Sequence, residues 1–323
     1  MGAEFFFLPY WMGLPRDMFL MGFAAKPESL IDDTPINAMG FTGDPINLTK
    51  SPATIRILTL GGSAMFNRRM AERLREGLTK VSRRPIEVLG AALRTHTTKA
   101  SVIKYKILRK YSFDFVLIYH GINDLWTNHV PIEDFRLDYS HLGPWYTRSL
   151  WLDHCLICRI TYNQLFYRRP ASYWVRENLA NFASEQTFHQ NIAVLINAIR
   201  QDGSTPILMT FAWSVPSHYS YEAFQSHTVG YNNPTDYDSW PVENWGSPEY
   251  VREGLRKHNN HLHQLARIYN VLLIDQERLM GKDLKWFGDV CHFSEEGTDR
   301  FIENISEFFI QKNLFHLETQ AIK

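Results

Sequence analysis

Three short polar blocks, far apart in the 323-residue chain, carry residue types that nucleophilic catalysis requires. Ser63 follows two glycines directly after an apolar run, where its hydroxyl can act as a nucleophile. Asp289 precedes His292 by three residues, so its carboxylate can reach the imidazole Nδ1 atom and orient the ring as a general base. Asn123, in the Gly-Ile-Asn-Asp block 121–124, can donate an amide hydrogen to a developing oxyanion.

Each block also has a purely structural explanation. A serine after a glycine turn is a common helix N-cap, and an Asn-Asp pair commonly forms an Asx turn. Asp289 can bond to the backbone N–H groups of its own loop. The catalytic interpretation gains weight because all three blocks follow predicted strands of one sheet. The chain order Ser, Asp, His is also one that convergent catalytic triads use.

Short apolar runs alternate with amphipathic segments along the chain. We predict strands at residues 55–60, 86–89, 115–119, 206–211 and 271–274, and helices at 68–81, 101–111, 182–200, 251–269 and 295–315. This alternation indicates right-handed crossovers and a three-layer α/β/α fold with a five-stranded parallel, flavodoxin-like sheet. Reactive groups of such sheets lie beyond the carboxyl ends of the strands, where the three polar blocks fall.

Two long segments interrupt the alternation, at about 125–174 and 212–250, and they hold seven of the nine tryptophans. No Ser/Gly-rich linker separates them from the rest, so we predict one domain over residues 51–315 with the two aromatic-rich segments as a cap. Residues 1–50 are predicted to be an arm packed on this domain. Trp126 and Trp213 are candidate substrate contacts, although such rings also suit the core of a cap.

The composition excludes several classes of protein. The 34 basic residues balance the 34 acidic ones and form no basic block, which excludes a nucleic-acid partner. Three cysteines in a chain of this length exclude a disulfide scaffold. The apolar N-terminal segment is interrupted by Pro9, Pro15, Arg16 and Asp17, so neither a signal peptide nor a membrane-spanning helix is predicted. Membrane association, localisation and oligomeric state stay open.

Other motifs do not indicate a cofactor. Cys155 and Cys158 form a C-x-x-C pair, and with Cys291 they still lack a fourth zinc ligand. The glycines at 61–62 lack the spacing of a dinucleotide-binding loop. His258 lies on the apolar stripe of the predicted helix 251–269, which indicates a hydrogen-bonded core histidine. We therefore predict neither a metal nor an organic cofactor.

Two of the blocks resemble those of the SGNH (GDSL-type) serine hydrolase superfamily. Residues 121–124 match its Gly-x-Asn-Asp block and residues 289–292 its Asp-x-x-His block, while 61–63 carry glycine in place of the aspartate of its Gly-Asp-Ser block. The resemblance covers roughly residues 36–315. It implies a triad of Ser63, His292 and Asp289, with no cofactor, and relatives are often extracytoplasmic. It also implies an oxyanion hole formed by the Ser63 N–H, the Asn123 amide and a third backbone donor.

The sequence departs from the family at that third donor. By its spacing from the second predicted strand, the family's oxyanion glycine falls at Thr95, and a β-branched residue resists a positive φ. Gly90 is the other candidate, but it lies earlier in the chain. Thr95 and Gly90 are therefore both carried forward as candidate donors.

The expected function is that of a serine esterase acting on a carboxylic ester of a small molecule or carbohydrate, such as an O-acetyl group. An O-acyltransferase would use the same acyl-enzyme and pass the acyl group to an acceptor hydroxyl. A binding protein on the same fold, without a competent oxyanion hole, is the alternative that the residue at Thr95 favours.

Overall fold

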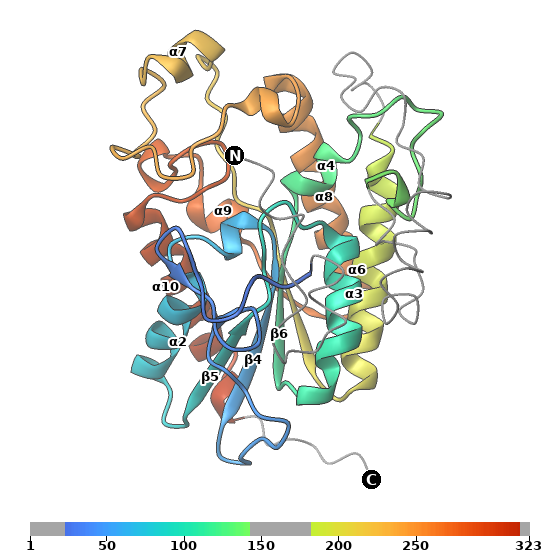
Figure 1. Ribbon diagram of the computed structural model, residues 1–323, viewed down its shortest axis with the longest axis vertical. Coiled ribbons are helices and arrows are strands. Elements are labelled where there is room, and N and C mark those ends of the chain that lie inside the picture. The colour runs from blue at the N-terminus through green and yellow to red at the C-terminus, as the bar shows by residue number, and fades with distance from the viewer. Residues whose placement is uncertain (1–22, 143–181, 317–323) are drawn as a thin grey trace.

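A computed structural model describes residues 23–142 and 182–316 (Figure 1). In this part of the chain a six-stranded sheet has the order β3-β5-β4-β6-β7-β8. The strands are β3 (Thr42–Gly43), β4 (Ile55–Gly61), β5 (Ile86–Gly90), β6 (Phe115–Tyr119), β7 (Thr205–Met209) and β8 (Leu272–Ile274). Strands β4 to β8 pair in parallel, in the flavodoxin-like order that the sequence predicted.

The prediction of five strands was wrong by one. The sheet has a sixth strand, β3, which pairs antiparallel with β5 at the sheet edge. Two residues are too few to show a strand periodicity, so β3 could not be predicted from the pattern of apolar residues. A separate two-stranded hairpin, β1 (Leu30–Ile31) with β2 (Thr34–Pro35), precedes it.

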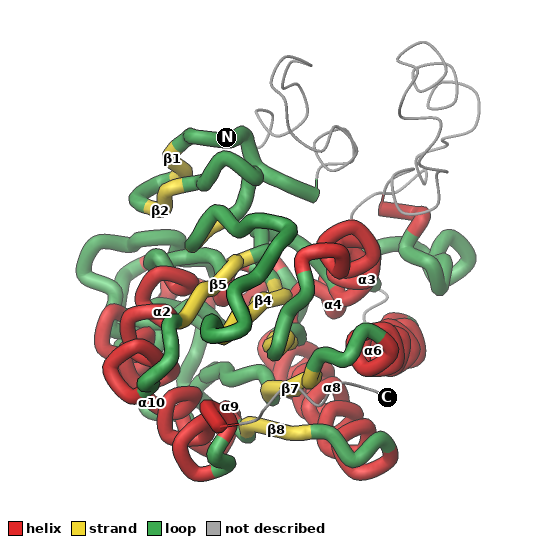
Figure 2. The backbone as a smooth tube through the Cα atoms, turned by 90° about the horizontal axis from the view of Figure 1, so that it is seen from below, coloured by secondary structure: helices red, strands yellow, loops and turns green. Residues whose placement is uncertain are grey.

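Helices cover both faces of the sheet, as Figures 1 and 2 show, with α2 and α10 on one side and α3, α6 and α8 on the other. The α-helices are α2 (Met70–Val81), α3 (Thr98–Leu108), α4 (Ile122–Trp126), α6 (Ser184–Gln201), α7 (Tyr221–Gln225), α8 (Pro248–Ile268), α9 (Gln276–Met280) and α10 (Glu295–Gln311). The 3₁₀ helices are η2 (Ser63–Met65), η3 (Arg109–Tyr111), η4 (Ser140–Leu142), η7 (Val242–Asn244), η8 (Leu284–Trp286) and η9 (Leu314–His316).

The two layers of helices enclose two separate cores because successive strand residues point to opposite faces. In β4, Ile57 belongs to the core under α2 and α10, and the next residue, Leu58, to the core under α3 and α6. Every residue of β4 and β6 is buried, which explains the continuously apolar sequence of β6 and the mostly apolar sequence of β4. The buried Arg56 of β4 pairs with Glu87 of β5 at 2.7 Å. Burial on both faces holds the central strands in place. The polar blocks 61–63 and 121–124 therefore lie at the carboxyl ends of β4 and β6, at one edge of the sheet.

The segment between β7 and α8 packs against the loop that follows β8. The Ser214 N–H donates to the Val290 carbonyl and the Asn232 N–H to the Phe287 carbonyl, both at 2.9 Å. The Tyr237 hydroxyl donates to Asp33 beside the β1–β2 hairpin, at 2.9 Å. This segment, residues 210–247, therefore bridges the N-terminal part of the chain and the loop that carries Asp289 and His292.

Parts of the predicted arm and insertions lie outside the described residues. This applies to residues 1–22, and to Trp145, Trp151, Trp174, Cys155 and Cys158 of the first insertion. Within residues 23–50, the side chains of Phe23, Ile36 and Phe41 are buried in the domain core.

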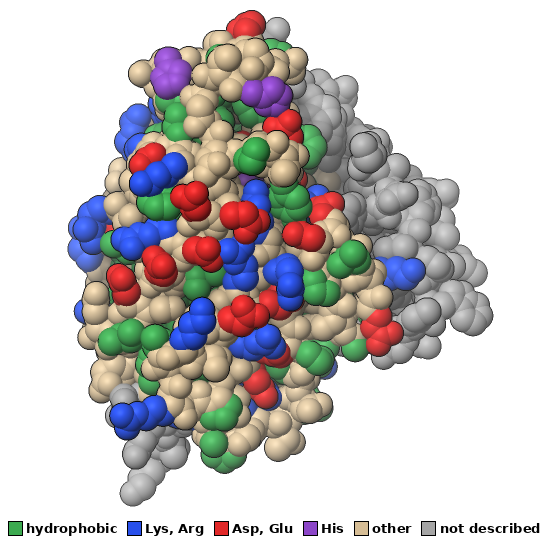
Figure 3. All heavy atoms as spheres, turned by 90° about the vertical axis from the view of Figure 1, so that its left-hand side faces the viewer, with side chains coloured by type: hydrophobic (Ala, Val, Ile, Leu, Met, Phe, Trp, Pro, Cys, Tyr) green, Lys and Arg blue, Asp and Glu red, His purple; other side chains and the backbone are tan. Residues whose placement is uncertain are grey.

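The surface over α2 and α10 mixes acidic and basic side chains (Figure 3). Arg73 pairs there with Glu295 at 2.6 Å and with Asp299 at 2.5 Å. Within the described ranges, no helix combines the length and the apolar character needed to cross a membrane.

Gly90 has a packing role in this fold. A Cβ atom at Gly90 would lie 2.0 Å from Thr42 Oγ1 and 2.8 Å from Ala71 Cβ, because β3 crosses closely at this point. We expect Gly90→Ala to lower the free energy of unfolding by about 1–3 kcal/mol, as overpacking does, measured by urea denaturation.

Thr42→Ala in the same chain removes the nearest obstructing atom and should restore part of that loss. A Gly90→Ala protein of unchanged stability would contradict the close packing of β3 on β5.

Candidate active site

The side chains of Ser63, His292 and Asp289 form one hydrogen-bonded line at the carboxyl edge of the sheet. Ser63 Oγ lies 2.7 Å from His292 Nε2, and His292 Nδ1 lies 2.7 Å from Asp289 Oδ2. With the Nδ1–H donated to Asp289, Nε2 is left to accept the serine proton. This is the tautomer that a histidine general base needs.

Ser63 is placed by the end of β4, which passes through Gly62 into the single turn of η2. A Cβ atom at Gly62 would lie 2.3 Å from Asn123 Nδ2, so a larger residue would displace that amide. Glycine at this position thus allows the Asn123 side chain to lie directly beside the nucleophile. The same turn holds Ser63 half-buried, with its hydroxyl toward His292.

Asn123 stands at the start of α4, immediately beyond β6. Its Nδ2 donates one hydrogen to the His96 carbonyl at 3.0 Å, which fixes the amide and leaves its second hydrogen for another acceptor. The neighbouring Asp124 is fully buried and accepts from the Thr98 N–H at 3.1 Å, from the Thr98 hydroxyl at 2.6 Å and from Tyr139 at 3.0 Å. Asp124 therefore ties the loop after β5 to α4.

Thr95 lies in a turn of that loop, closed by the His96 N–H bonding to the Leu93 carbonyl at 3.3 Å. Its φ is 62°, in the left-handed region where glycine is usual. The threonine thus adopts the conformation that sequence reasoning expected it to resist. Gly90, the other candidate donor, lies within β5 between Thr42 of β3 and Thr59 of β4, which separates it from this turn.

Asp289 is held by four hydrogen bonds. Its Oδ1 accepts the backbone N–H of Cys291 at 2.8 Å and of His292 at 2.7 Å. Its Oδ2 accepts His292 Nδ1 and, at 2.9 Å, the backbone N–H of Trp240 from the segment before α8. The carboxylate is completely buried, so these donors replace the water it would otherwise bind.

The electrostatics favour a protonated histidine. Burial by itself would lower the pKa of His292, but the adjacent Asp289 carboxylate outweighs burial and raises that pKa well above its usual value. Cys291, beside the ring, is buried, and burial raises the pKa of its thiol to about 12. The imidazolium that a general base becomes is therefore stabilised, while the neighbouring thiol stays protonated at neutral pH.

Asp238 is a residue of the site that the sequence analysis missed. Its Oδ2 lies 3.4 Å from His292 Nε2, on the side of the ring that faces Ser63, and its side chain is 5% exposed. Burial would raise the pKa of Asp238, but His292 and Arg94, with hydrogen bonds from Trp240 and Asn67, keep it below its ordinary value. An ionised carboxylate therefore faces His292 Nε2. The sequence around residue 238 contains no motif from which this contact could be predicted.

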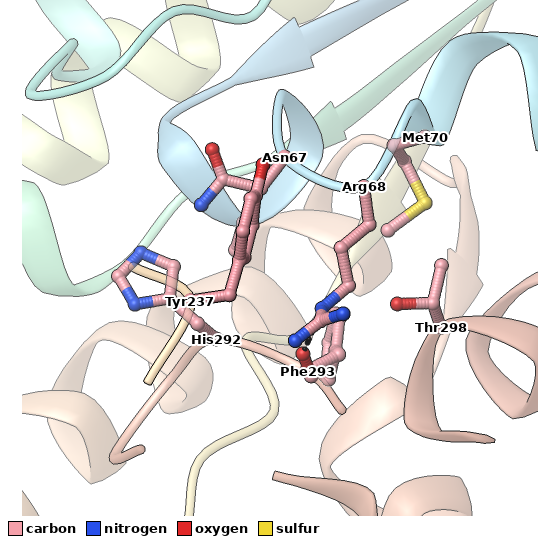
Figure 4. A pocket seen from close by; sticks show the side chains of 8 residues that line it. Asn67, Arg68, Met70, Tyr237, His292, Phe293 and Thr298 are labelled. Atoms are coloured by element: carbon pink, nitrogen blue, oxygen red, sulfur yellow. Dashed lines mark hydrogen bonds between the residues drawn. The ribbon is translucent and has the colours of Figure 1, made fainter. Parts of the chain in front are cut away.

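A small pocket adjoins the histidine, with His292 at one end and Thr298 at the other (Figure 4). The Arg68 guanidinium lies over the Tyr237 ring, 4.8 Å from its centroid, and the Arg68 Nε–H donates to the Phe293 carbonyl at 2.7 Å. Two distant segments of chain thus close this side of the site.

The two candidate aromatic contacts, Trp126 and Trp213, pack in or against the hydrophobic core. Trp213 is 6% exposed and packs in the core, with Lys282 Nζ 3.2 Å above its ring centroid, and Trp126 ends the short helix α4. Among the described residues, Trp245 has its ring beside His292, with ring centroids 6.5 Å apart. Trp240 lies close by through its backbone bond to Asp289.

Two other sequence motifs have structural roles. His258 is fully buried, stacks on Phe188 with centroids 4.1 Å apart, and its Nδ1 lies 3.1 Å from the Gly121 carbonyl oxygen, as a core histidine was predicted to do. Within the described ranges, Asp289, Cys291 and His292 form the one group close enough to share a metal ion. Asp289 and His292 are hydrogen-bonded to each other at 2.7 Å, and burial keeps the Cys291 thiol protonated at neutral pH.

No family model and no curated protein matches the chain. Solved structures with a similar fold include a lipase/acylhydrolase from Enterococcus faecalis, 14% identical over 80% of this chain and 96% of that one, with a TM-score of 0.46. A GDSL-like lipase from Bacteroides thetaiotaomicron VPI-5482 is 11% identical over 80% and 88%, with a TM-score of 0.46. An acetyl xylan esterase, AlAXEase, is 13% identical over 79% and 99%, with a TM-score of 0.45.

The raised pKa of His292 has a consequence for the pH dependence of any reaction that needs its neutral form. We expect kcat/KM to rise with pH through a value above 6.5, the ordinary pKa of histidine. Asp238→Asn removes a negative charge 3.4 Å from Nε2, so the acidic limb should move about 1–2 pH units lower.

Asp236→Asn is the matched control, since that carboxylate is 56% exposed and pairs with His227. An acidic limb that stays in place in Asp238→Asn would contradict the electrostatic contact between Asp238 and His292.

Proposed function

We propose that this protein is a serine hydrolase that cleaves a carboxylic ester through an acyl-enzyme on Ser63. The observation that carries the proposal is the line from Ser63 to His292 to Asp289, with both hydrogen bonds at 2.7 Å, beside the amide of Asn123. A helix N-cap or a polar loop would require neither the buried carboxylate behind the ring nor the amide beside the hydroxyl.

In the first step, Ser63 Oγ attacks the ester carbonyl carbon as its proton passes to His292 Nε2. The new Oγ–C bond moves the carbonyl π electrons onto oxygen and forms a tetrahedral oxyanion. When the oxyanion collapses, the bond from carbon to the alcohol oxygen breaks, and Nε2 returns the proton to that oxygen. The alcohol departs and the acyl group stays on Ser63.

In the second step, a water molecule attacks the acyl carbon and gives its proton to Nε2. Collapse breaks the Oγ–C bond, the proton goes back to Ser63, and the carboxylic acid leaves. An acceptor alcohol in place of water would give transesterification by the same residues. Asp289 keeps the ring oriented and stabilises the imidazolium in both steps.

The oxyanion is proposed to bind three donors: the Ser63 N–H, the second hydrogen of Asn123 Nδ2 and the Thr95 N–H. The left-handed φ of Thr95 supports its assignment over Gly90, since it is the conformation expected of a glycine at this turn. The same observation weakens the case for a binding protein, which rested on the mismatch at this residue.

A fluorophosphonate tests the nucleophile without knowledge of the substrate. We expect intact-mass analysis to show one adduct on the wild-type protein and on Cys291→Ala, and none on Ser63→Ala, because the phosphonate traps only an activated serine. Cys291→Ala is the control for the other nucleophile beside His292.

The absence of an adduct on folded wild-type protein would refute the hydrolase mechanism and favour the binding-protein alternative. An adduct on Ser63→Ala would move the nucleophile to another residue.

The third oxyanion donor is tested by two substitutions of one residue. Thr95→Pro removes the N–H and forces φ to about −65°, so we expect kcat to fall about 10²–10³-fold. Thr95→Gly keeps the N–H and accepts the observed φ of 62°, so it should cost far less activity.

Steady-state kinetics on any turned-over ester gives the comparison, and thermal melts show whether each variant is folded. Equal activity of the two folded variants would remove Thr95 from the oxyanion hole.

A further inference from the structure

We propose that the carboxylate of Asp238 binds a hydroxyl group of the alcohol half of the ester, so that the substrates are esters of sugars or other polyols with a free hydroxyl beside the esterified one. The inference rests on the proposed hydrolase function and names the substrate class of that same site.

The position of Asp238 relative to the leaving group carries the first step. His292 Nε2 must hand its proton to the alcohol oxygen, so that oxygen has to come within hydrogen-bond distance of Nε2. Asp238 Oδ2 lies 3.4 Å from the same nitrogen. The atoms bonded to the leaving oxygen therefore lie within reach of this carboxylate, whatever the rest of the alcohol is.

The charge at Asp238 restricts what those atoms can be. An anionic alcohol would be repelled, and an apolar one would cover an ionised carboxylate without giving it a hydrogen bond, which costs free energy. The charge is already partly balanced by Arg94, whose Nη2 lies 3.6 Å from Oδ1, and by the imidazolium that forms during reaction. Each oxygen also accepts one hydrogen bond, Oδ2 from Asn67 and Oδ1 from the Trp240 indole, and a carboxylate oxygen can accept a second. The carboxylate can still accept a further hydrogen bond, and a neutral donor such as a hydroxyl suits it better than a second cation does.

The surroundings of Asp238 also suit a polyol. The Trp240 indole is 48% exposed, and its Nε1–H donates to Asp238 Oδ1 at 2.7 Å. Trp245 lies beside His292, with ring centroids 6.5 Å apart. An exposed ring next to a hydrogen-bonding carboxylate offers an apolar surface for the C–H groups of a sugar and an acceptor for its hydroxyls.

The segment that presents Asp238 is firmly anchored. The Tyr237 hydroxyl bonds to Asp33, Asn67 Nδ2 donates to Asp238 Oδ2, and the Trp240 N–H bonds to the triad carboxylate. These contacts hold Asp238 at a φ of 44°, a left-handed conformation that few residues adopt without support. The carboxylate is thus held in place before any substrate arrives, as a recognition group requires.

The test compares two acetate esters of nearly equal size, 2-hydroxyethyl acetate and propyl acetate, which differ in the hydroxyl beside the ester. We expect the wild type to show a kcat/KM at least about tenfold higher for the hydroxyethyl ester, since a hydrogen bond to a charged acceptor is worth roughly ten- to hundredfold. In Asp238→Gly, which accepts the positive φ, the ratio should fall to about one.

Asp236→Gly is the matched control, because Asp236 also has a positive φ, at 52°, yet faces His227 at the surface. It should keep the wild-type ratio. Asp238→Asn is the second variant in case the glycine variant fails to fold, and it should lower the ratio less severely because its amide oxygen still accepts. Fluorophosphonate labelling of each protein counts the working sites.

A wild-type ratio near one, or a high ratio retained in Asp238→Gly, would overturn the proposal. So would an Asp238-dependent preference for acetylcholine over the hydroxyethyl ester, which would make the site one for cations. Labelling at Ser63 with neither acetate turned over would refute the leaving-group subsite while leaving the hydrolase intact, whereas no labelling would refute the hydrolase itself.

Discussion

The arrangement of the site depends on the hydrogen bonds of one buried carboxylate, that of Asp289. Both of its oxygens are occupied, by the imidazole, by two backbone N–H groups of its own loop and by the Trp240 N–H. A carboxylate without exposure to water is stable as an anion only when such donors surround it. One residue therefore holds the His292 ring, the loop after β8 and the segment before α8 together.

A second buried carboxylate, that of Asp124, holds other loops of the site together in a similar way. Asp124, in α4, accepts from Thr98 at the N-terminus of α3 and from Tyr139 just before η4. Burial raises the pKa of Asp124 to about 7, against the effect of those hydrogen bonds. The loop that carries Thr95 and His96 leads directly into Thr98, and the His96 carbonyl accepts from Asn123 beside Asp124. The site is thus held from two directions by polar contacts that the sheet shields from water.

The segment before α8 gives this fold its individual character. A sheet of this kind brings three loops to one edge, but Asp238, whose carboxylate lies 3.4 Å from His292 Nε2, comes from a fourth segment with no regular structure around it. Its anchors are distant in the chain: Asn67 and Asp238, which share a hydrogen bond, are 171 residues apart. The charge beside the reacting nitrogen, and with it the proposed choice of substrate, is a property of that segment rather than of the sheet.

The sequence by itself determined the parallel strands and the polar residues that follow them, because apolar periodicity and turn residues are local properties of a chain. Ser63, Asn123, Asp289 and His292 could be named from their places after apolar runs. The edge strand β3 could not be predicted, because two residues are too few to show an alternation of apolar and polar side chains. The φ of Thr95 and the approach of Asp238 to His292 were decided only by the tertiary structure, since each depends on which distant segments pack against it.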